Sequence, residues 1–78
     1  MPNLNFTLVG RSDSGLTQIW EVMSVHTGVN LGRISWYSPW RRYAFYPGPS
    51  LFDADCLREI ATFLAEQMQI RSQDRQLR

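Results

Sequence analysis

The sequence predicts an α+β fold, in which a four-stranded antiparallel meander (ββββα) is followed by one C-terminal amphipathic helix packed on one face. Two observations lead to this prediction. Up to residue 46, short segments alternate apolar and polar residues or are rich in β-branched and aromatic residues, and turn-forming residues separate them. From residue 53 onwards, apolar residues recur with the period of a helix. A chain of 78 residues makes one domain.

The first two strands are predicted from their side-chain patterns. Leu4–Leu8 alternates apolar and polar residues, as a half-buried strand does. The polar segment Gly10–Gly15 is predicted to be a loop. Thr17–Val25 is rich in β-branched and aromatic residues and is predicted to be the second strand. The hairpin connection that follows, His26–Gly28, ends in a glycine that adopts positive φ angles without strain.

Prolines and glycines delimit the third and fourth strands. These strands are predicted over Leu31–Tyr37 and Arg42–Tyr46. Pro39, in the turn between them, cannot donate to a sheet ladder. The segment Pro47-Gly48-Pro49 then ends the fourth strand.

The helix is predicted to begin after Asp53, which is a favourable N-cap residue. Phe52 and Leu57 have the spacing of a hydrophobic staple. The apolar stripe that follows consists of Cys56, Leu57, Ile60, Ala61, Phe63, Leu64 and Met68. The chain from Ser72 onwards is polar and lacks this pattern. We therefore expect a single α+β domain over residues 1–72 and a frayed tail over residues 73–78.

Strand pairing assigns the side chains to two faces of the sheet. If Ser38–Arg41 joins the last two strands, Tyr37 lies opposite Arg42 and alternate residues share a face. A three-residue His26–Gly28 connection turns Glu21 outward, whereas a two-residue turn would bury it without a partner. The core is then predicted to contain Trp20, Val22, Ile34, Trp36, Tyr43 and Phe45, covered by Leu57, Ile60, Phe63 and Leu64.

The other face, together with the adjacent turn, is the candidate nucleic-acid-binding site. Its residues are aromatic or basic: Arg33, Tyr37, Trp40, Arg41, Arg42 and Tyr46. Rings that stack on bases, next to guanidinium groups that contact phosphates, are the combination that single-strand binders use. Two alternatives stay open. The arginines and tyrosines simply cover the sheet through cation–π contacts, or the face is a self-association surface.

Several kinds of chemistry have no support in the sequence. With one cysteine and one histidine, a chain forms neither an internal disulfide nor a structural zinc site. No glycine spacing matches a phosphate-binding loop, and no catalytic triad is evident. The helix dipole would activate Cys56, but its place on the apolar stripe favours a buried, inert thiol. Capping explains Asp53 and Asp55, so we expect a protein that is not an enzyme and needs no cofactor or metal.

A characteristic pattern occupies the centre of the chain: Trp36-Tyr37, then Trp40-Arg41-Arg42-Tyr43-Ala44-Phe45-Tyr46-Pro47, then Asp53, Cys56-Leu57, Ile60-Ala61 and Phe63. Through it, residues 31–68 resemble a family of very short proteins of unassigned function from bacteriophages and prophage-bearing bacteria. The resemblance implies a phage origin. The order of four strands and a helix is also similar to PC4-like single-strand-binding proteins, which pair through their helices and bind with their sheets. That family is richer in lysine, and this chain has none.

Composition restricts the partner and the compartment. A net charge of +1 argues against binding dominated by electrostatics, although all eight basic residues are arginine, which grips phosphates and stacks on rings. No signal peptide or membrane-spanning run is evident, so we expect a cytoplasmic protein.

We predict a small non-enzymatic module that binds single-stranded nucleic acid, with homodimer formation left open. The alternative is a protein-interaction module that binds or inhibits a host protein through the same face.

Overall fold

The predicted α+β meander is confirmed: four antiparallel strands form one sheet in the order β1-β2-β3-β4, and one helix follows. The computed structural model of the chain describes residues 3–12 and 15–76. The strands are β1 (Leu4–Arg11), β2 (Gln18–Ser24), β3 (Asn30–Tyr37) and β4 (Arg42–Pro47). A 3-10 turn, η1 (Ser38–Trp40), joins β3 to β4, and the helix α1 spans Ala54–Gln76. α1 continues past Ser72 to Gln76, so the helix does not end at the predicted boundary. The domain boundary at residue 72 and the frayed tail over residues 73–78 stay predictions, and residues 77–78 lie outside the described part of the chain.

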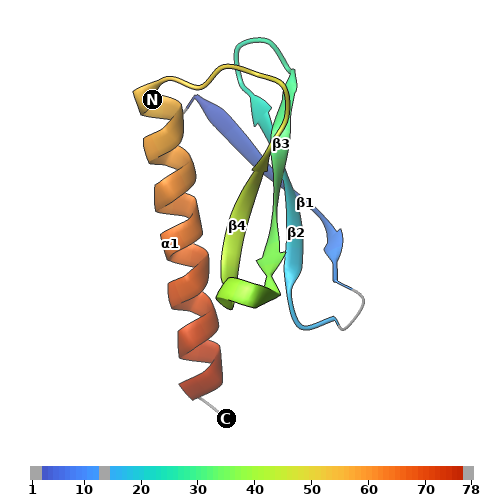
Figure 1. The fold of residues 1–78 in the computed structure, drawn as a ribbon, viewed down its shortest axis with the longest axis vertical. Helices are drawn as coiled ribbons and strands as arrows, with labels where there is room; N and C mark the ends of the chain where they lie inside the picture. Colours follow the sequence, from blue (N-terminus) through green and yellow to red (C-terminus); the bar gives the residue numbers. More distant parts are fainter. Residues whose placement is uncertain (1–2, 13–14, 77–78) are drawn as a thin grey trace.

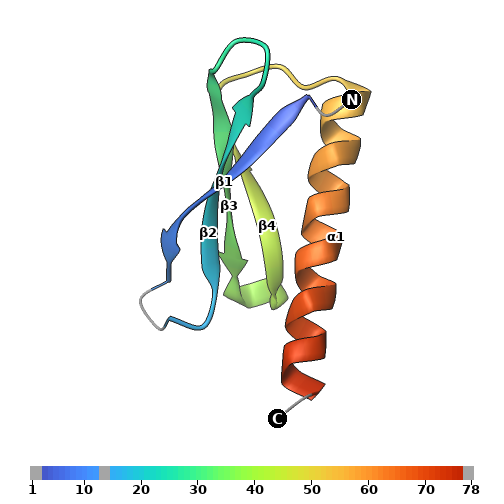
Figure 2. The same ribbon diagram turned by 180° about the vertical axis from the view of Figure 1, so that it is seen from behind.

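The sheet is twisted, and α1 lies along one side of it (Figures 1 and 2). In both views β4 runs alongside the helix, and β1 crosses the other strands obliquely. The rings of Phe6 in β1 and Phe63 in α1 are stacked, with centroids 4.2 Å apart. No other described segment covers the opposite side of the sheet, so that side is open to solvent.

The predicted assignment of residues to the two faces is confirmed. Tyr37 pairs with Arg42, and Ile34 pairs with Phe45 on one side and with Trp20 on the other. Ile34 and Val22 are completely buried under the helix. The buried core consists of Leu4, Trp20, Val22, Leu31, Ile34, Tyr43 and Ile60, with Trp36, Phe45, Phe63 and Leu64 packed against it. Of these residues, Leu4 and Leu31 were not predicted to be core.

One core prediction is wrong, because Leu57 is 52% exposed. Ile60 is buried and marks the side of α1 that faces the sheet. Leu57 lies about 60° around the helix from Ile60, on the flank of the apolar stripe. Leu64, at a similar angle two turns later, is half-buried. The flank of the stripe is therefore covered in the middle of the helix but not in its first turn.

Two β-bulges change the side-chain alternation that the sequence suggests. In β1 the pairing shifts between Leu8 and Gly10, so Val9 is the extra residue. In the β2–β3 pair the shift leaves Leu31 as the extra residue. With this second bulge Glu21 pairs with Arg33 and stays on the outward face, as predicted, although the connection runs over residues 25–29 rather than 26–28. Bulges strengthen the local twist and re-aim neighbouring side chains.

Two carboxylates position the start of the helix. Asp53 accepts a hydrogen bond from the backbone N–H of Cys56 (2.9 Å), which confirms the predicted N-cap. Glu59 accepts hydrogen bonds from the backbone N–H groups of Asn3 (2.9 Å) and Leu4 (3.2 Å) and from the side-chain amide of Asn3 (2.8 Å). Glu59 therefore ties the beginning of β1 to α1.

The N-cap predicts a pH-dependent contribution to stability. The pKa of Asp53 is held below its ordinary value, mainly by the hydrogen bond from the Cys56 backbone N–H and to a smaller extent by one from the Cys56 side chain. A depressed folded-state pKa stabilises the fold above the unfolded-state pKa, and this stabilisation is lost as pH falls through the folded-state pKa. We expect Asp53→Asn, which keeps a capping side chain but removes the charge, to lower the thermal unfolding midpoint at neutral pH. The difference in unfolding midpoint between Asp53→Asn and the parent chain should vanish in strong acid. A difference that stays constant with pH would contradict the prediction.

Candidate nucleic-acid interface

All six predicted site residues belong to the hairpin formed by β3, η1 and β4. Arg33 lies opposite Tyr46, and Tyr37 lies opposite Arg42. Because Ile34 is buried under α1 and successive residues of a strand alternate, these four residues lie on the face that α1 does not cover. Tyr46 is 42% exposed and Tyr37 is half-buried. The three arginine side chains of this set are exposed. The pairing of these residues therefore follows the sequence prediction.

The first group of site residues, the turn group, consists of Tyr37, Trp40, Arg41 and Arg42. Trp40 ends η1 and is 65% exposed. Its ring meets Tyr37 edge to face, with centroids 4.8 Å apart. The Arg42 Nε donates a hydrogen bond to the backbone carbonyl of Trp40 (3.4 Å). These contacts hold an open indole ring at the tip of the hairpin.

Arg41 has an unusual backbone conformation that places it at the end of this turn. Its φ and ψ are 53° and 48°, in the left-handed region, and its N–H donates to the carbonyl of Ser38 (3.0 Å). This conformation costs a residue with a side chain roughly 1–2 kcal/mol. Such strain often occurs at functional turns.

The second group, the strand group, consists of Arg33 and Tyr46. Tyr37 is four positions after Arg33 in β3, so the two groups are about 13 Å apart along the strand. Between them lies the pair formed by Ser35 and Ala44, which are small side chains. The structure thus brings the six residues onto one hairpin as two groups, not as one cluster.

The hairpin is the basic region of a nearly neutral chain. Residues 30–49 include three arginines and no acidic residue, whereas five of the seven acidic residues lie between positions 53 and 74. Among the described side chains, the ion pair joins Arg58 to Asp55 on α1 (2.8 Å). Glu21, half-buried, faces Arg33 across the β2–β3 pair. The guanidinium groups of the turn group are available to an anionic ligand.

The other residues with reactive side chains do not form a comparable site. Among the described side chains, no group of three from His, Cys, Asp or Glu could hold a metal ion. Burial raises the pKa of the Cys56 thiol, and the hydrogen bond and charge of Asp53 raise it further. The thiol is therefore protonated at neutral pH. Cys56 is half-buried rather than buried, and its lack of reactivity stays a prediction. His26 is exposed in the β2–β3 connection, with Nε2 3.2 Å from the Asn3 Oδ1.

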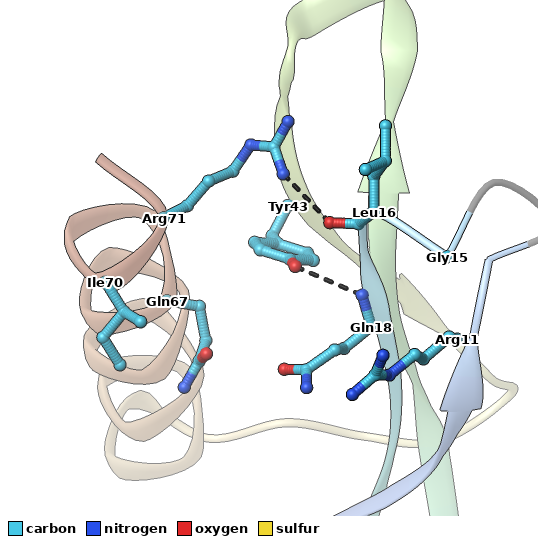
Figure 3. Close-up of a pocket in the computed structure, with 8 residues that line it drawn as sticks. All are labelled: Arg11, Gly15, Leu16, Gln18, Tyr43, Gln67, Ile70 and Arg71. Carbon is cyan, nitrogen blue, oxygen red and sulfur yellow. Dashed lines mark hydrogen bonds between the residues drawn. The ribbon is translucent and has the colours of Figure 1, made fainter. Parts of the chain in front are cut away.

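The structure also brings together two arginines that the sequence does not connect with any site. Arg71 of α1 places its guanidinium over the Trp36 ring, 4.3 Å from the centroid, and donates a hydrogen bond to the Leu16 carbonyl (3.2 Å). Arg11, at the end of β1, lines the same pocket as Arg71 (Figure 3). The sequence assigns Arg71 only a favourable interaction with the helix dipole, and it predicts that Arg11 lies in a loop.

Comparisons of the chain with protein-family models, with curated proteins and with solved structures find no match. The resemblance of residues 31–68 to short phage proteins and the architectural similarity to PC4-like proteins therefore stay predictions. In the part of the chain that the structure describes, no helix combines the length and apolar character needed to cross a bilayer.

Proposed function

We propose that this chain is a small, non-enzymatic binding module that engages single-stranded nucleic acid through the β3–η1–β4 hairpin. Trp40, Tyr37 and Tyr46 would stack on bases, and Arg33, Arg41 and Arg42 would contact phosphates. The observation that carries the proposal is the open Trp40 ring at the tip of a hairpin that has three exposed arginines and no acidic residue.

A single strand fits this surface better than a duplex does. Stacking needs the open face of a base, which a duplex hides between neighbouring base pairs. Each base stacked on an aromatic ring contributes about 1–3 kcal/mol, so a few rings suffice without a high net charge. The two groups of residues lie along one strand direction, which suits an extended ligand that contacts both groups.

The proposal has three further parts, which rest on the sequence. The resemblance of residues 31–68 suggests a phage origin. The lone thiol suits a reducing compartment, so we expect the module to act in the cytoplasm. Homodimer formation would add buried area to a small domain, and we retain it as part of the proposal.

The salt dependence of oligonucleotide binding tests the proposal. We expect a single-stranded oligonucleotide to quench the tryptophan fluorescence and to bind about 15- to 20-fold more weakly at about 200 mM than at about 50 mM salt. Three phosphate contacts predict a log–log slope of about −2 for a single strand. Arg42→Gln should make this slope shallower by about 0.7, whereas Arg58→Gln, on the exposed side of α1, should leave it unchanged. Absence of quenching, or binding that is insensitive to salt, would refute the proposal.

The alternative is a protein-interaction module that uses the same face to bind or inhibit a host protein. Ile19 and Met23 of β2 favour it, because they add apolar surface beside the hairpin that base stacking does not need. Tyrosine, tryptophan and arginine also anchor protein interfaces. Pull-down from host lysate with and without nuclease separates the two functions. A partner that is captured only without nuclease supports nucleic-acid binding.

A further inference from the structure

A second polar site lies at the other side of the sheet, between the C-terminal half of α1 and the end of the β1–β2 pair. It is a pocket of about 290 Å³. Figure 3 shows that Gln67 of α1, Gln18 of β2 and Arg11 of β1 direct their polar ends towards the same space beside Tyr43. In this view the Arg71 guanidinium lies on the other side of the Tyr43 ring, next to Leu16. None of these residues belongs to the predicted nucleic-acid-binding set. The pocket therefore needs an explanation of its own.

The bulge at Val9 is what brings Arg11 into this pocket. Leu8 pairs with Trp20 on the helix side of the sheet, and uninterrupted alternation would turn Arg11 to the opposite face. With the extra residue, Arg11 instead pairs with Gln18, which lies two positions from buried Trp20. Arg11 is exposed, and its side chain has neither an ion pair nor a hydrogen bond among the described residues. The bulge thus aims an uncompensated cation at the space beside α1.

Arg71 supplies the second cation and is held in place by the protein. Stacking on Trp36 and the hydrogen bond to the Leu16 carbonyl fix its guanidinium group. Its Nε is buried and has no hydrogen-bond partner within the described part of the chain. A buried donor without a partner costs about 1–3 kcal/mol. Because Arg71 also lines the pocket, its positive charge lies close to any anion bound there.

Neutral donors complete the lining. The Tyr43 hydroxyl accepts a hydrogen bond from the Gln18 backbone N–H (3.3 Å), so its own proton remains available to a ligand. The side-chain amides of Gln18 and Gln67 each carry an NH₂ group that can donate. Among the described residues that line the pocket, none is acidic. The lining therefore combines two guanidinium groups with three neutral donors.

We infer that this pocket binds a phosphate monoester group. A phosphate monoester carries about −1.5 to −2 charges at neutral pH, which matches two arginines, and its oxygens accept several hydrogen bonds at once. Arginine forks are suited to this geometry. A carboxylate, with one negative charge, would leave one guanidinium without a counter-charge.

The source of the phosphate is either a small molecule or the end of a nucleic-acid strand. A second depression of about 450 Å³ shares Arg11, Leu16 and Arg71 with the pocket and reaches Ser35 and Ser38 of the hairpin. The terminal phosphate of a bound strand could therefore follow this depression from the hairpin. Inorganic phosphate or a mononucleotide would enter the pocket directly, without a strand bound to the hairpin.

Side-chain NMR of the full chain tests the inference directly. Inorganic phosphate, added at constant ionic strength, should produce saturable shifts of the side-chain N–H signals of Arg11, Gln18, Gln67 and Arg71. Arg11→Gln should weaken the apparent affinity about tenfold, because it removes charge-assisted hydrogen bonds. Gln67→Leu, a second variant that keeps both arginines, should also weaken the apparent affinity, because it removes one of the neutral donors. Arg58→Gln, an exposed arginine elsewhere on α1, should bind as the parent chain does.

The outcomes separate this inference from the proposed function. Loss of oligonucleotide binding in Trp40→Ala with unchanged phosphate shifts supports a pocket that is independent of the hairpin. Pocket shifts with a 5′-phosphorylated oligonucleotide but not with its unphosphorylated form identify a strand end, and shifts with phosphate or a mononucleotide alone identify a small molecule. Absence of saturable shifts with every phosphate probe, or shifts that persist unchanged in both Arg11→Gln and Gln67→Leu, would overturn the inference.

Discussion

Replacement of Gly32 by alanine is expected to destabilise the fold by about 2–5 kcal/mol, which is a large part of the stability of a small domain. Gly32 has a φ of 155°, which side chains rarely adopt. A Cβ atom at this position would collide with the carbonyl oxygen of Tyr46 and would lie 2.8 Å from the Phe45 ring. Both the backbone and the neighbouring strand would have to move. Urea unfolding of the two proteins measures the difference.

Gly28→Ala is the matched control for this substitution. Gly28 has a φ of 73°, but a Cβ atom there would meet no atom within 4 Å. Gly28→Ala should therefore lower the free energy of unfolding only through backbone strain, by about 1–2 kcal/mol. If Gly32→Ala costs no more than Gly28→Ala, the close approach of β3 to β4 is not needed for stability. This matters for the site, because the β3–β4 pairing places Arg33 opposite Tyr46.

Side-chain alternation was sufficient to predict the fold and the two faces of the sheet. Trp20 and Val22 in β2 and Ile34 and Trp36 in β3 are large apolar residues spaced by two, so only one register buries all of them. The glycine and proline turns then limit the possible connections. The burial of Ile34 and the exposure of Arg33 follow from this alternation alone.

The sequence could not predict the places where one extra residue changes the alternation. Val9 and Leu31 are ordinary strand residues, and the glycine that follows each of them does not show where the extra residue lies. Arg11 was therefore assigned to a loop, and Leu31 was not assigned to the core. Leu57 fits the helical period, but the period does not reveal how much of the helix the sheet covers. The contact of Arg71 with Trp36 joins residues 35 positions apart, and no local pattern encodes it.

The candidate site was predicted in composition but not in shape. The residue types and their face followed from the strand register, which the structure reproduces. The edge-to-face contact between Tyr37 and Trp40, and the left-handed Arg41, depend on η1, which the sequence shows only as a proline-containing turn. The separation into a turn group and a strand group is therefore information that the structure adds.

Trp40→Ala is expected to weaken single-stranded oligonucleotide binding roughly 5- to 150-fold, which corresponds to the loss of one stacked base. Because the ring is 65% exposed and its backbone contacts remain, the unfolding free energy should change by no more than about 0.5 kcal/mol. The affinity is measured by fluorescence anisotropy of a labelled oligonucleotide, since the substitution removes a tryptophan signal. Trp40→Phe keeps a ring and should retain most of the affinity.

Leu51→Ala is the control for a general loss of apolar surface, because Leu51 is 98% exposed and lies outside the hairpin. It should bind as the parent chain does. If Trp40→Phe binds as weakly as Trp40→Ala, the ring does not act by stacking, since phenylalanine also offers a π-face. If all three variants bind the oligonucleotide equally well, the hairpin is not the nucleic-acid surface. The protein-interaction alternative would then account better for the exposed indole, because indoles buried at interfaces are frequent anchors.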